Sequence, residues 1–411
     1  MSGSRSSLIA LDSAPAGDYH RLKAAIAGMP LPLALLDLDL LEANAMAMLK
    51  RAGSLPIRLG TKSIRCTEVL RRVQRLSPLF RGLLCYSGRE AAWLAAQGFD
   101  DLLVAYPTVE PADIDAVAAQ VARGATITLM VDDAEQLTVI AAIANRAGLT
   151  LRVAIDLDCS TEEPGIYFGV RRSPIRSAAA ALALAQAIDV HRGALKLVGL
   201  MGYEAQIAGL QDAVPGSGLR NHMIRWFKQR SMRTLSTRRQ AAVAALREAG
   251  YALEFVNGGG TGSLEATAAD SSVTEIAAGS GLYAPGLFDH FSHFHHAPSL
   301  CFALPVVRRP APGLVTCAGG GYIASGPVGP DRAPVPWLPN GCSLLPLEGA
   351  GEVQTPVKLP PGFAPALGDP LFFRHAKAGE LAERFDHFAL LQRGSVVGDA
   401  PTYRGDGQTF F

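Results

Sequence analysis

The chain has 411 residues, of which 49% are hydrophobic and 18% are charged, and its formal net charge is +1. This composition is typical of a well-buried globular enzyme, the length predicts two domains, and the balanced charge excludes a broad basic surface for nucleic acid. The sequence contains no run of about 18 apolar residues that would predict a membrane span, and its start lacks the apolar core of a signal peptide, so we expect a cytoplasmic protein. The six cysteines lack CxxC spacing, so we expect neither a disulfide framework nor a structural zinc site.

The predicted secondary structure begins with a strand over residues 32–40 and an amphipathic helix over about 41–52. After these elements, short apolar runs alternate with alanine-rich segments of helical length. The runs predict strands over 57–61, 82–86, 102–106, 126–131, 151–157, 197–202, 253–256 and 273–277. The segments between them predict helices over 67–76, 89–97, 112–123, 134–147, 177–187, 234–249 and 264–269. Eight strands with helices between them are the repeat of a (β/α)8 TIM barrel, although a doubly wound open sheet would give the same alternation.

The composition changes near residue 296. Proline and glycine become dense beyond it, and the apolar runs shorten to the length of strands. We therefore expect a barrel over residues 41–295 and a mostly β C-terminal domain over 296–411. The early strand lies outside the count of eight, so the segment 1–40 is expected to join the β domain.

Lys62 stands at the centre of the stretch PIRLGTKSIRC, residues 56–66, where a short buried strand gives way to a helix. In a barrel of parallel strands this end of the strand forms the rim at which chemistry is done. A lysine held there among apolar walls would have its neutral form favoured, as a Schiff-base nucleophile requires. The alternative is a strand-end lysine that only reaches solvent.

Two turns rich in small residues follow the seventh and eighth predicted strands. The first contains Gly258, Gly259, Gly260, Thr261 and Gly262, and the second contains Gly279 and Ser280. Such turns expose backbone N–H groups that bind an anion, and these loops are the usual phosphate site of a TIM barrel. The spacing fits neither the dinucleotide fingerprint nor a P-loop. A lysine after strand one and a phosphate cup after strands seven and eight share one rim, which predicts pyridoxal 5'-phosphate as the cofactor.

Several further residues are candidates for contacts at this rim. Tyr203, after the sixth strand, could stack on or hydrogen-bond the cofactor, with a packed rim tyrosine as the alternative. Arg65 and Arg172 are candidate partners of a carboxylate or phosphate, and a solvated surface role is the alternative. Asp156 and Asp158 end the fifth strand, where they are expected to hold neighbouring loops.

The chain resembles the fold-type III pyridoxal-phosphate enzymes, specifically the group of D-threonine aldolase and D-serine dehydratase, which is related to alanine racemase. The motifs that carry the resemblance are LLDLDLLEAN, RLGTKSIRC, LLVAYP, GLMGYEAQ, NGGGTGS, TEIAAGS and GDPLFFRHAK, in this order along nearly the whole chain. The resemblance implies a barrel plus a β domain built from both chain ends, and a homodimer. It also implies that Lys62 is the Schiff-base lysine and that the two glycine turns hold the phosphate.

The expected activity is retro-aldol cleavage of D-configured β-hydroxy amino acids to glycine and an aldehyde. Dehydration and deamination of substrates like D-serine, and amino-acid racemisation, are the alternatives. His375 is the candidate base for the substrate hydroxyl, because the ordinary histidine pKa lies near working pH; a histidine that hydrogen-bonds within the β domain is the alternative.

The resemblance also implies a divalent metal on a His-x-Asp or His-x-Cys pair, but here the pair reads His375-Ala376-Lys377. A protonated lysine is a poor metal ligand, so the metal is left open. Our hypothesis is that the Lys377 ammonium supplies the positive charge instead. The histidines between residues 290 and 296 do not share one clean face, and no metal site is predicted there.

Overall fold

The computed structural model describes residues 17–163 and 165–410. Its internal contacts divide the chain into two units. Among the described residues, one unit comprises Ala45–Gly281, His290–Phe294 and 407–410; the other comprises 17–44, Leu282–Asp289 and His295–Asp406. The prediction for the segment 1–40 falls partly on residues 1–16, which lie outside the described residues.

The first unit contains a closed barrel in which every neighbouring pair of strands is parallel. In the order of the chain its strands are β2 (Ile57–Gly60), β3 (Phe80–Cys85), β4 (Leu102–Val104), β5 (Ile127–Val131), β6 (Leu151–Asp156), β9 (Leu195–Gly202), β10 (Phe255–Gly258) and β11 (Glu275–Ala278). The last strand pairs with the first, with Ile276 opposite Ile57, and this pairing closes the ring. The TIM-barrel prediction is confirmed, and the open sheet is excluded.

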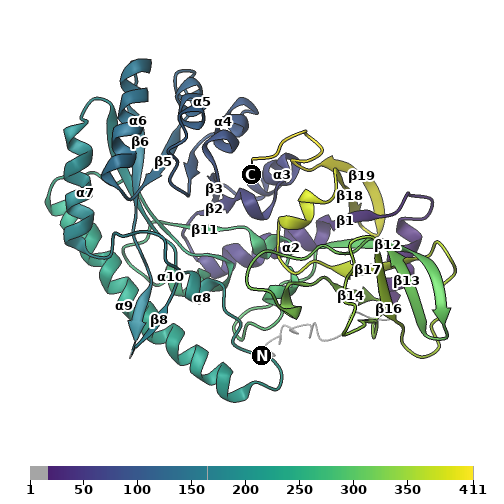
Figure 1. Cartoon of the computed structure of the whole chain (residues 1–411). Helices are drawn as coiled ribbons and strands as arrows, with labels where there is room; N and C mark the ends of the chain where they lie inside the picture. Colours follow the sequence, from purple (N-terminus) through teal and green to yellow (C-terminus); the bar gives the residue numbers. More distant parts are fainter. Residues whose placement is uncertain (1–16, 164, 411) are drawn as a thin grey trace, which may run out of the picture. The chain divides into compact units, whose positions relative to one another are not determined.

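Helices surround the barrel strands. They are α3 (Thr67–Leu76), α4 (Gly88–Ala96), α5 (Pro111–Val121), α6 (Ala134–Ala147), α7 (Ala178–Val190), α9 (Gly218–Glu248) and α10 (Leu264–Ala268). Figure 1 shows α4, α5, α6 and α7 side by side along the outside of the barrel. The helix α6 illustrates how the sequence sets these bounds, because Asp133 and Gln136 form a capping box at its start and Gly148, at φ 65°, ends it in the left-handed conformation.

The barrel core is apolar. Its buried cluster includes Leu103, Met130, Ala154, Val198, Met201 and Phe255, which come from five different strands. Side chains of alternating strands fill the interior of a TIM barrel in this way, so the ring is a packed core whose chemistry is confined to its rim.

The structure departs from the sequence prediction on the side of β6 and β9. A short antiparallel hairpin, β7 (Thr161–Glu163) with β8 (Ile166–Phe168), and a single-turn helix α8 (Ala205–Ala208) were not predicted. Helix α9 begins at Gly218 rather than at Thr234. Its first turns carry basic residues and expose Leu219, Met223 and Trp226, so no buried apolar stripe marks them as a helix.

The second unit is built on a mixed sheet in the order β15 (Ser343–Leu344), β16 (Gln354–Lys358), β13 (Leu314–Ala318), β12 (Leu300–Ala311), β1 (Leu33–Asp37), β18 (His387–Gln392), β19 (Ser395–Pro401). A further strand, β17 (Pro370–Arg374), pairs with β12 and with β14 (Val335–Leu338). The early strand β1 runs antiparallel to β12 and parallel to β18. It is therefore an inner strand of the C-terminal sheet.

Helix α1 (Gly17–Ala25) packs on this sheet through Tyr19 and Leu22, which share a buried cluster with Leu35 and Phe372. Helix α2 (Leu38–Ala52) follows β1 directly. Every helix of the described residues is too short or too polar to cross a lipid bilayer.

Candidate functional site

Three short 3-10 turns lie at the carboxyl ends of neighbouring barrel strands. Turn η1 (Thr61–Ser63) follows β2, η2 (Thr261–Ser263) follows β10, and η3 (Ser280–Leu282) follows β11. Because β11 pairs with both β10 and β2, the turns meet on one rim. Ser63 Oγ lies 2.9 Å from Ser280 Oγ, and the Gly281 amide donates to Thr261 Oγ1 at 2.9 Å. Hydroxyl groups thus join the lysine turn η1 to η3, and η3 to η2.

The glycine turns are too tight for side chains. A Cβ on Gly262 would collide with the carbonyl oxygen of Ala208, and one on Gly279 would lie 2.7 Å from the carbonyl oxygen of Gly60. Within the described ranges, the amides of Thr261, Gly262 and Ser280 donate to no acceptor, as expected at the first residues of helical turns. Thr261 and Gly262 are buried. The N–H groups of Thr261 and Gly262 are therefore buried and unused within the described residues, and such groups are able to bind an anion.

A buried ion network supports the first glycine turn. Glu204 and Arg239 are both completely buried, and their charged groups approach to 3.2 Å. Glu204 also accepts hydrogen bonds from Thr267 Oγ1 at 2.6 Å and from the Gly259 amide at 2.7 Å. Gly258 ends β10 on the same side, where a Cβ would lie 3.1 Å from Arg239 Nη2. Gly258 and Gly259 thus contact the pair of Glu204 and Arg239. Gly260, Thr261 and Gly262 form the part of the turn that does not contact this pair.

Lys62 lies in η1 on the rim, but its surroundings differ from those expected. The residue is exposed, so the expected apolar walls are absent from the described residues. Its Nζ donates to Tyr106 Oη at 2.8 Å and lies 5.4 Å from the centre of that ring. A phenol hydroxyl is therefore the polar group in direct contact with the candidate nucleophile.

Arg172 places a second cation beside the same tyrosine. Its guanidinium carbon lies 5.7 Å from the ring centre of Tyr106 and 5.8 Å from that of Tyr203. Burial raises the pKa of Tyr106, but the charges of Lys62 and Arg172 outweigh burial, and the net shift is downward. Burial raises the pKa of Tyr203, and there the same two cations oppose the shift without reversing it.

The carboxylates of Asp156, the last residue of β6, and of Asp158 have separate surroundings. Burial, reinforced by the charge of Asp132, raises the pKa of Asp156 to about 7, while Arg172 opposes the shift. Asp158 accepts hydrogen bonds from Ser160 N at 2.6 Å and Ser160 Oγ at 2.8 Å, and it pairs with Arg176 at 3.2 Å. The expected loop-holding role is confirmed for Asp158.

His375 and Lys377 lie in the other unit, directly after β17. His375 is buried, and neither ring nitrogen has a hydrogen-bond partner within the described residues. Burial lowers its pKa to about 3, the nearby Arg374 charge adds to the shift, and the backbone of Leu300 opposes it in part. The expectation of a pKa near working pH is therefore wrong for this histidine, because desolvation disfavours the imidazolium.

The Lys377 ammonium is already engaged. It donates to Ser325 Oγ at 2.7 Å and pairs with Glu380 at 3.4 Å, and Glu380 in turn accepts a hydrogen bond from the Ser325 amide at 2.8 Å. Glu380 begins the turn η6 (Glu380–Glu383). Lys377 thus connects the segment that follows β17 to the loop around Ser325.

A model of the alanine racemase N-terminal domain family matches residues 36–285. The chain belongs to this family. A D-threonine aldolase of an Arthrobacter species is 31% identical over 317 residues, which cover 74% of this chain and 75% of the relative. A 3-hydroxy-D-aspartate aldolase of Paracoccus denitrificans is 30% identical over 236 residues, which cover 56% of this chain and 54% of the relative.

Solved structures agree on the fold. The D-threonine aldolase from Filomicrobium marinum superposes with a TM-score of 0.77 at 22% identity, covering 92% of this chain and 95% of that one. The D-threo-3-hydroxyaspartate dehydratase from Delftia sp. HT23 gives a TM-score of 0.71 at 22% identity, covering 92% and 98%. Membership of the alanine racemase-like family implies pyridoxal phosphate as the cofactor.

The side chains that the structure describes do not assemble a recognisable metal centre. Across residues 17–163 and 165–410, no three His, Cys, Asp or Glu side chains converge as metal ligands do. The imidazole of His375 has lone pairs to offer, but the residue two positions on carries an ammonium, which has none. The residues present do not fit the His-x-Asp or His-x-Cys metal pair that the sequence resemblance implies.

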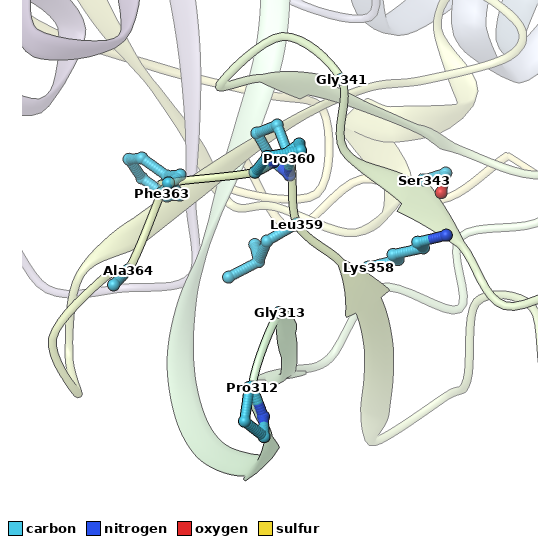
Figure 2. Close-up of a pocket in the computed structure, with 11 residues that line it drawn as sticks. Pro312, Gly313, Gly341, Ser343, Lys358, Leu359, Pro360, Phe363 and Ala364 are labelled. Carbon is cyan, nitrogen blue, oxygen red and sulfur yellow. The ribbon is translucent and has the colours of Figure 1, made fainter.

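The second unit also carries an open groove of about 770 Å³, shown in Figure 2. It is lined by Pro312, Gly313, Gly341, Ser343 and residues 358–364, with the paired residues Lys358 and Ser343 on one side. The lining is mostly proline, glycine and aliphatic side chains and holds no carboxylate, histidine or thiol. It offers no acid–base pair for catalysis.

Sequence reasoning missed two parts of the site. Tyr106 lies in the motif LLVAYP but was not singled out, although a tyrosine directly after a barrel strand falls on the rim by position alone. The pairing of Glu204 with Arg239 joins residues that are 35 positions apart. Since α9 carries many arginines, no pattern in the sequence marks Arg239 as the buried one.

Proposed function

We propose that the chain is a pyridoxal 5'-phosphate-dependent aldolase that cleaves D-configured β-hydroxy amino acids to glycine and an aldehyde. The observation that carries the proposal is 31% identity to a D-threonine aldolase over about three quarters of both chains. The second curated relative, a 3-hydroxy-D-aspartate aldolase, belongs to the same reaction class.

The rim fits the cofactor that the family implies. Lys62 offers an exposed amine for covalent attachment, and Thr261 and Gly262 offer buried amides for a phosphate. Gly279 and Ser280 close the cup from the neighbouring strand. Tyr203 lies beside Arg172 on the same rim, where its ring is available for stacking. When bound, the cofactor withdraws electrons from the substrate's α-carbon.

His375 and Lys377 are the candidates for the groups that act on the substrate hydroxyl. We propose that the neutral imidazole of His375 accepts the hydroxyl proton and that the Lys377 ammonium steadies the developing charge. The unpartnered ring nitrogens of His375 support the first role. The ion pair with Glu380 limits the second, because Lys377 must exchange this partner to offer its full charge.

Dehydration is the second candidate reaction. A low pKa makes His375 a weak base, and retro-aldol cleavage depends on removal of the hydroxyl proton more directly than dehydration does. The fold is also shared with the D-threo-3-hydroxyaspartate dehydratase. Racemisation stays a third alternative. The resemblance further supports a homodimer that acts in the cytoplasm on a small amino-acid substrate.

Purified protein should be incubated with a panel of D- and L-β-hydroxy amino acids while glycine, keto acid and enantiomer are assayed separately. Formation of glycine from the D-substrates supports the aldolase proposal. Formation of keto acid as the main product would show that the protein is a dehydratase instead. Lys62→Ala should abolish cofactor absorbance and activity. Lys196→Ala, which removes an exposed lysine paired with Glu254, is the matched control and should leave both unchanged.

The role of Lys377 is tested by metal removal. If its ammonium replaces a metal ion, dialysis against a chelator should leave wild-type activity intact, and Lys377→Ala should lose most activity. Added divalent metal should then restore part of the activity in Lys377→Ala, because the metal ion would supply the positive charge that the ammonium gave. Loss of wild-type activity on chelation would refute the idea.

A further inference from the structure

The hydroxyl of Tyr106 contacts the one atom of the chain that is proposed to bond the cofactor. Tyr106 follows β4 and Lys62 follows β2, so two different strands bring Oη and Nζ to 2.8 Å. The tyrosine is half-buried, and both its hydroxyl and its ring lie beside the Lys62 ammonium. This contact needs no cofactor or partner to form it.

A lysine must lose a proton before it can act as a nucleophile. Burial among apolar groups is one way to favour the neutral amine, but Lys62 is exposed. The second way is an adjacent base that removes the proton. Tyr106 is the ionisable group within hydrogen-bonding distance of Nζ among the described residues.

Charges around Tyr106 favour its phenolate form. The cations facing it are Lys62 and Arg172, whose guanidinium lies 5.7 Å from the ring centre. Tyr203 faces the same two cations, and Asp156 faces Arg172. The two cations lower the pKa of Tyr106 against the effect of burial. Tyr203 makes no hydrogen bond to Lys62 in the described part of the chain, so the two tyrosines differ in the contact that matters.

We propose that Tyr106 is a catalytic residue that exchanges a proton with Lys62, an inference that rests on the proposed cofactor attachment at that lysine. In the forward step an N–H bond of the Lys62 ammonium breaks and an O–H bond forms on the Tyr106 phenolate oxygen. The electron pair left on Nζ is then free to attack a carbonyl carbon. When the lysine is released from the cofactor, the phenol returns the proton to the amine. Arg172 acts as a positioning residue that stabilises the phenolate.

The first experiment needs no cofactor. The nine tyrosines of the full-length chain are titrated by ultraviolet difference absorbance of tyrosinate, with the cofactor removed. We expect one tyrosine to ionise before the others in the wild type and in Tyr203→Phe, and this early phase to be missing in Tyr106→Phe. In Arg172→Gln the phase should move to higher pH. An unchanged titration in Tyr106→Phe overturns the proposal.

The second experiment measures the rate at which pyridoxal 5'-phosphate attaches to the cofactor-free protein, followed by absorbance between pH 6 and pH 10. Removal of a general base typically costs about 100-fold or more, so Tyr106→Phe should attach the cofactor roughly 100-fold more slowly near pH 7. The deficit should shrink at high pH, where solvent deprotonates the lysine without help. Tyr251→Phe, at a tyrosine whose hydroxyl donates to Asp189, is the control and should keep the wild-type rate and pH dependence.

A merely structural role predicts a different result. If Tyr106 only packed beside Lys62, the rate would fall by the same factor at every pH or would not fall, and either pattern overturns the proposal. Unchanged circular dichroism and thermal midpoint in Tyr106→Phe confirm that the fold is intact. If the cofactor attaches normally but no β-hydroxy amino acid is cleaved, the proposed activity fails while these two measurements still decide the role of Tyr106.

Discussion

The carboxylate of Glu204 accepts a hydrogen bond from the Gly259 amide at 2.7 Å, and this contact holds the backbone at the start of the glycine turn in place. Gly259 has a φ of 92°, a conformation that a side chain would disfavour, and a Cβ there would lie 2.5 Å from Ile276. The acid, its arginine and the glycine thus form one support on which the open amides of the turn depend.

Glu204→Gln should destabilise the protein by about 3 kcal/mol, because it removes one of the two buried carboxylates, Glu204 and Asp270, that pair with the buried Arg239. The amide that replaces the carboxylate has one acceptor oxygen where Gly259, Thr267 and Arg239 use two, so the support of the turn is weakened and affinity for pyridoxal 5'-phosphate should fall at least tenfold. Urea unfolding and cofactor titration measure the two effects. Glu254→Gln is the matched control: Glu254 pairs with Arg152 and Lys196 at the surface, and its loss should cost no more than about 1 kcal/mol.

Gly262→Ala should open the phosphate turn, because the new Cβ meets the backbone oxygen of Ala208, which cannot rotate away. Overpacking of this kind costs about 1–3 kcal/mol, and we expect cofactor affinity to fall at least tenfold. Equilibrium dialysis against pyridoxal 5'-phosphate measures the change. Gly218→Ala has open space around its Cβ and should bind as the wild type does. Equal affinities in both variants would show that η2 does not hold the phosphate.

Acid should destabilise the protein through His375. Its pKa in the folded state is lowered to about 3 by burial, below the ordinary value of 6.5, so only the unfolded state takes up the proton as pH falls from 6.5 toward 3. Stability that is present above pH 6.5 is therefore lost over this window. Between pH 7 and pH 5 the loss amounts to about 2 kcal/mol.

The variant His375→Leu removes this dependence and should lose about 2 kcal/mol less than the wild type over the same interval, as measured by urea unfolding at both pH values. His387→Asn, at an exposed histidine of the same unit, should keep the wild-type pH dependence. A slope that is identical in His375→Leu and the wild type would mean that the buried imidazole is protonated in the folded protein.

The eight barrel strands were predictable because each has a buried apolar run of strand length, and their order around the ring follows the order of the chain. The position of Lys62 and of the glycine turns on the rim followed from that order. The hairpin of β7 with β8 and the first turns of α9 were not predictable, because long-range contacts such as Thr161 with Ser231 hold them.

The surroundings of the site residues were less predictable than their positions. Sequence places Lys62 at the end of a strand but does not show whether solvent or apolar groups surround it. It favours an ordinary pKa for His375, whereas complete burial shifts that pKa far downward. Burial and charge pairing depend on which segments fold against each residue, and a single sequence does not report that.

The hydrogen bond between Ser63 and Ser280 joins turns that are 217 positions apart. During synthesis the amine therefore leaves the ribosome long before the second half of the cup exists. A growing chain can bind the vitamin B6 cofactor tightly only after its last barrel strand, β11, has paired with the first, β2. Cofactor absorbance on nascent or truncated chains would thus show at which chain length the barrel closes.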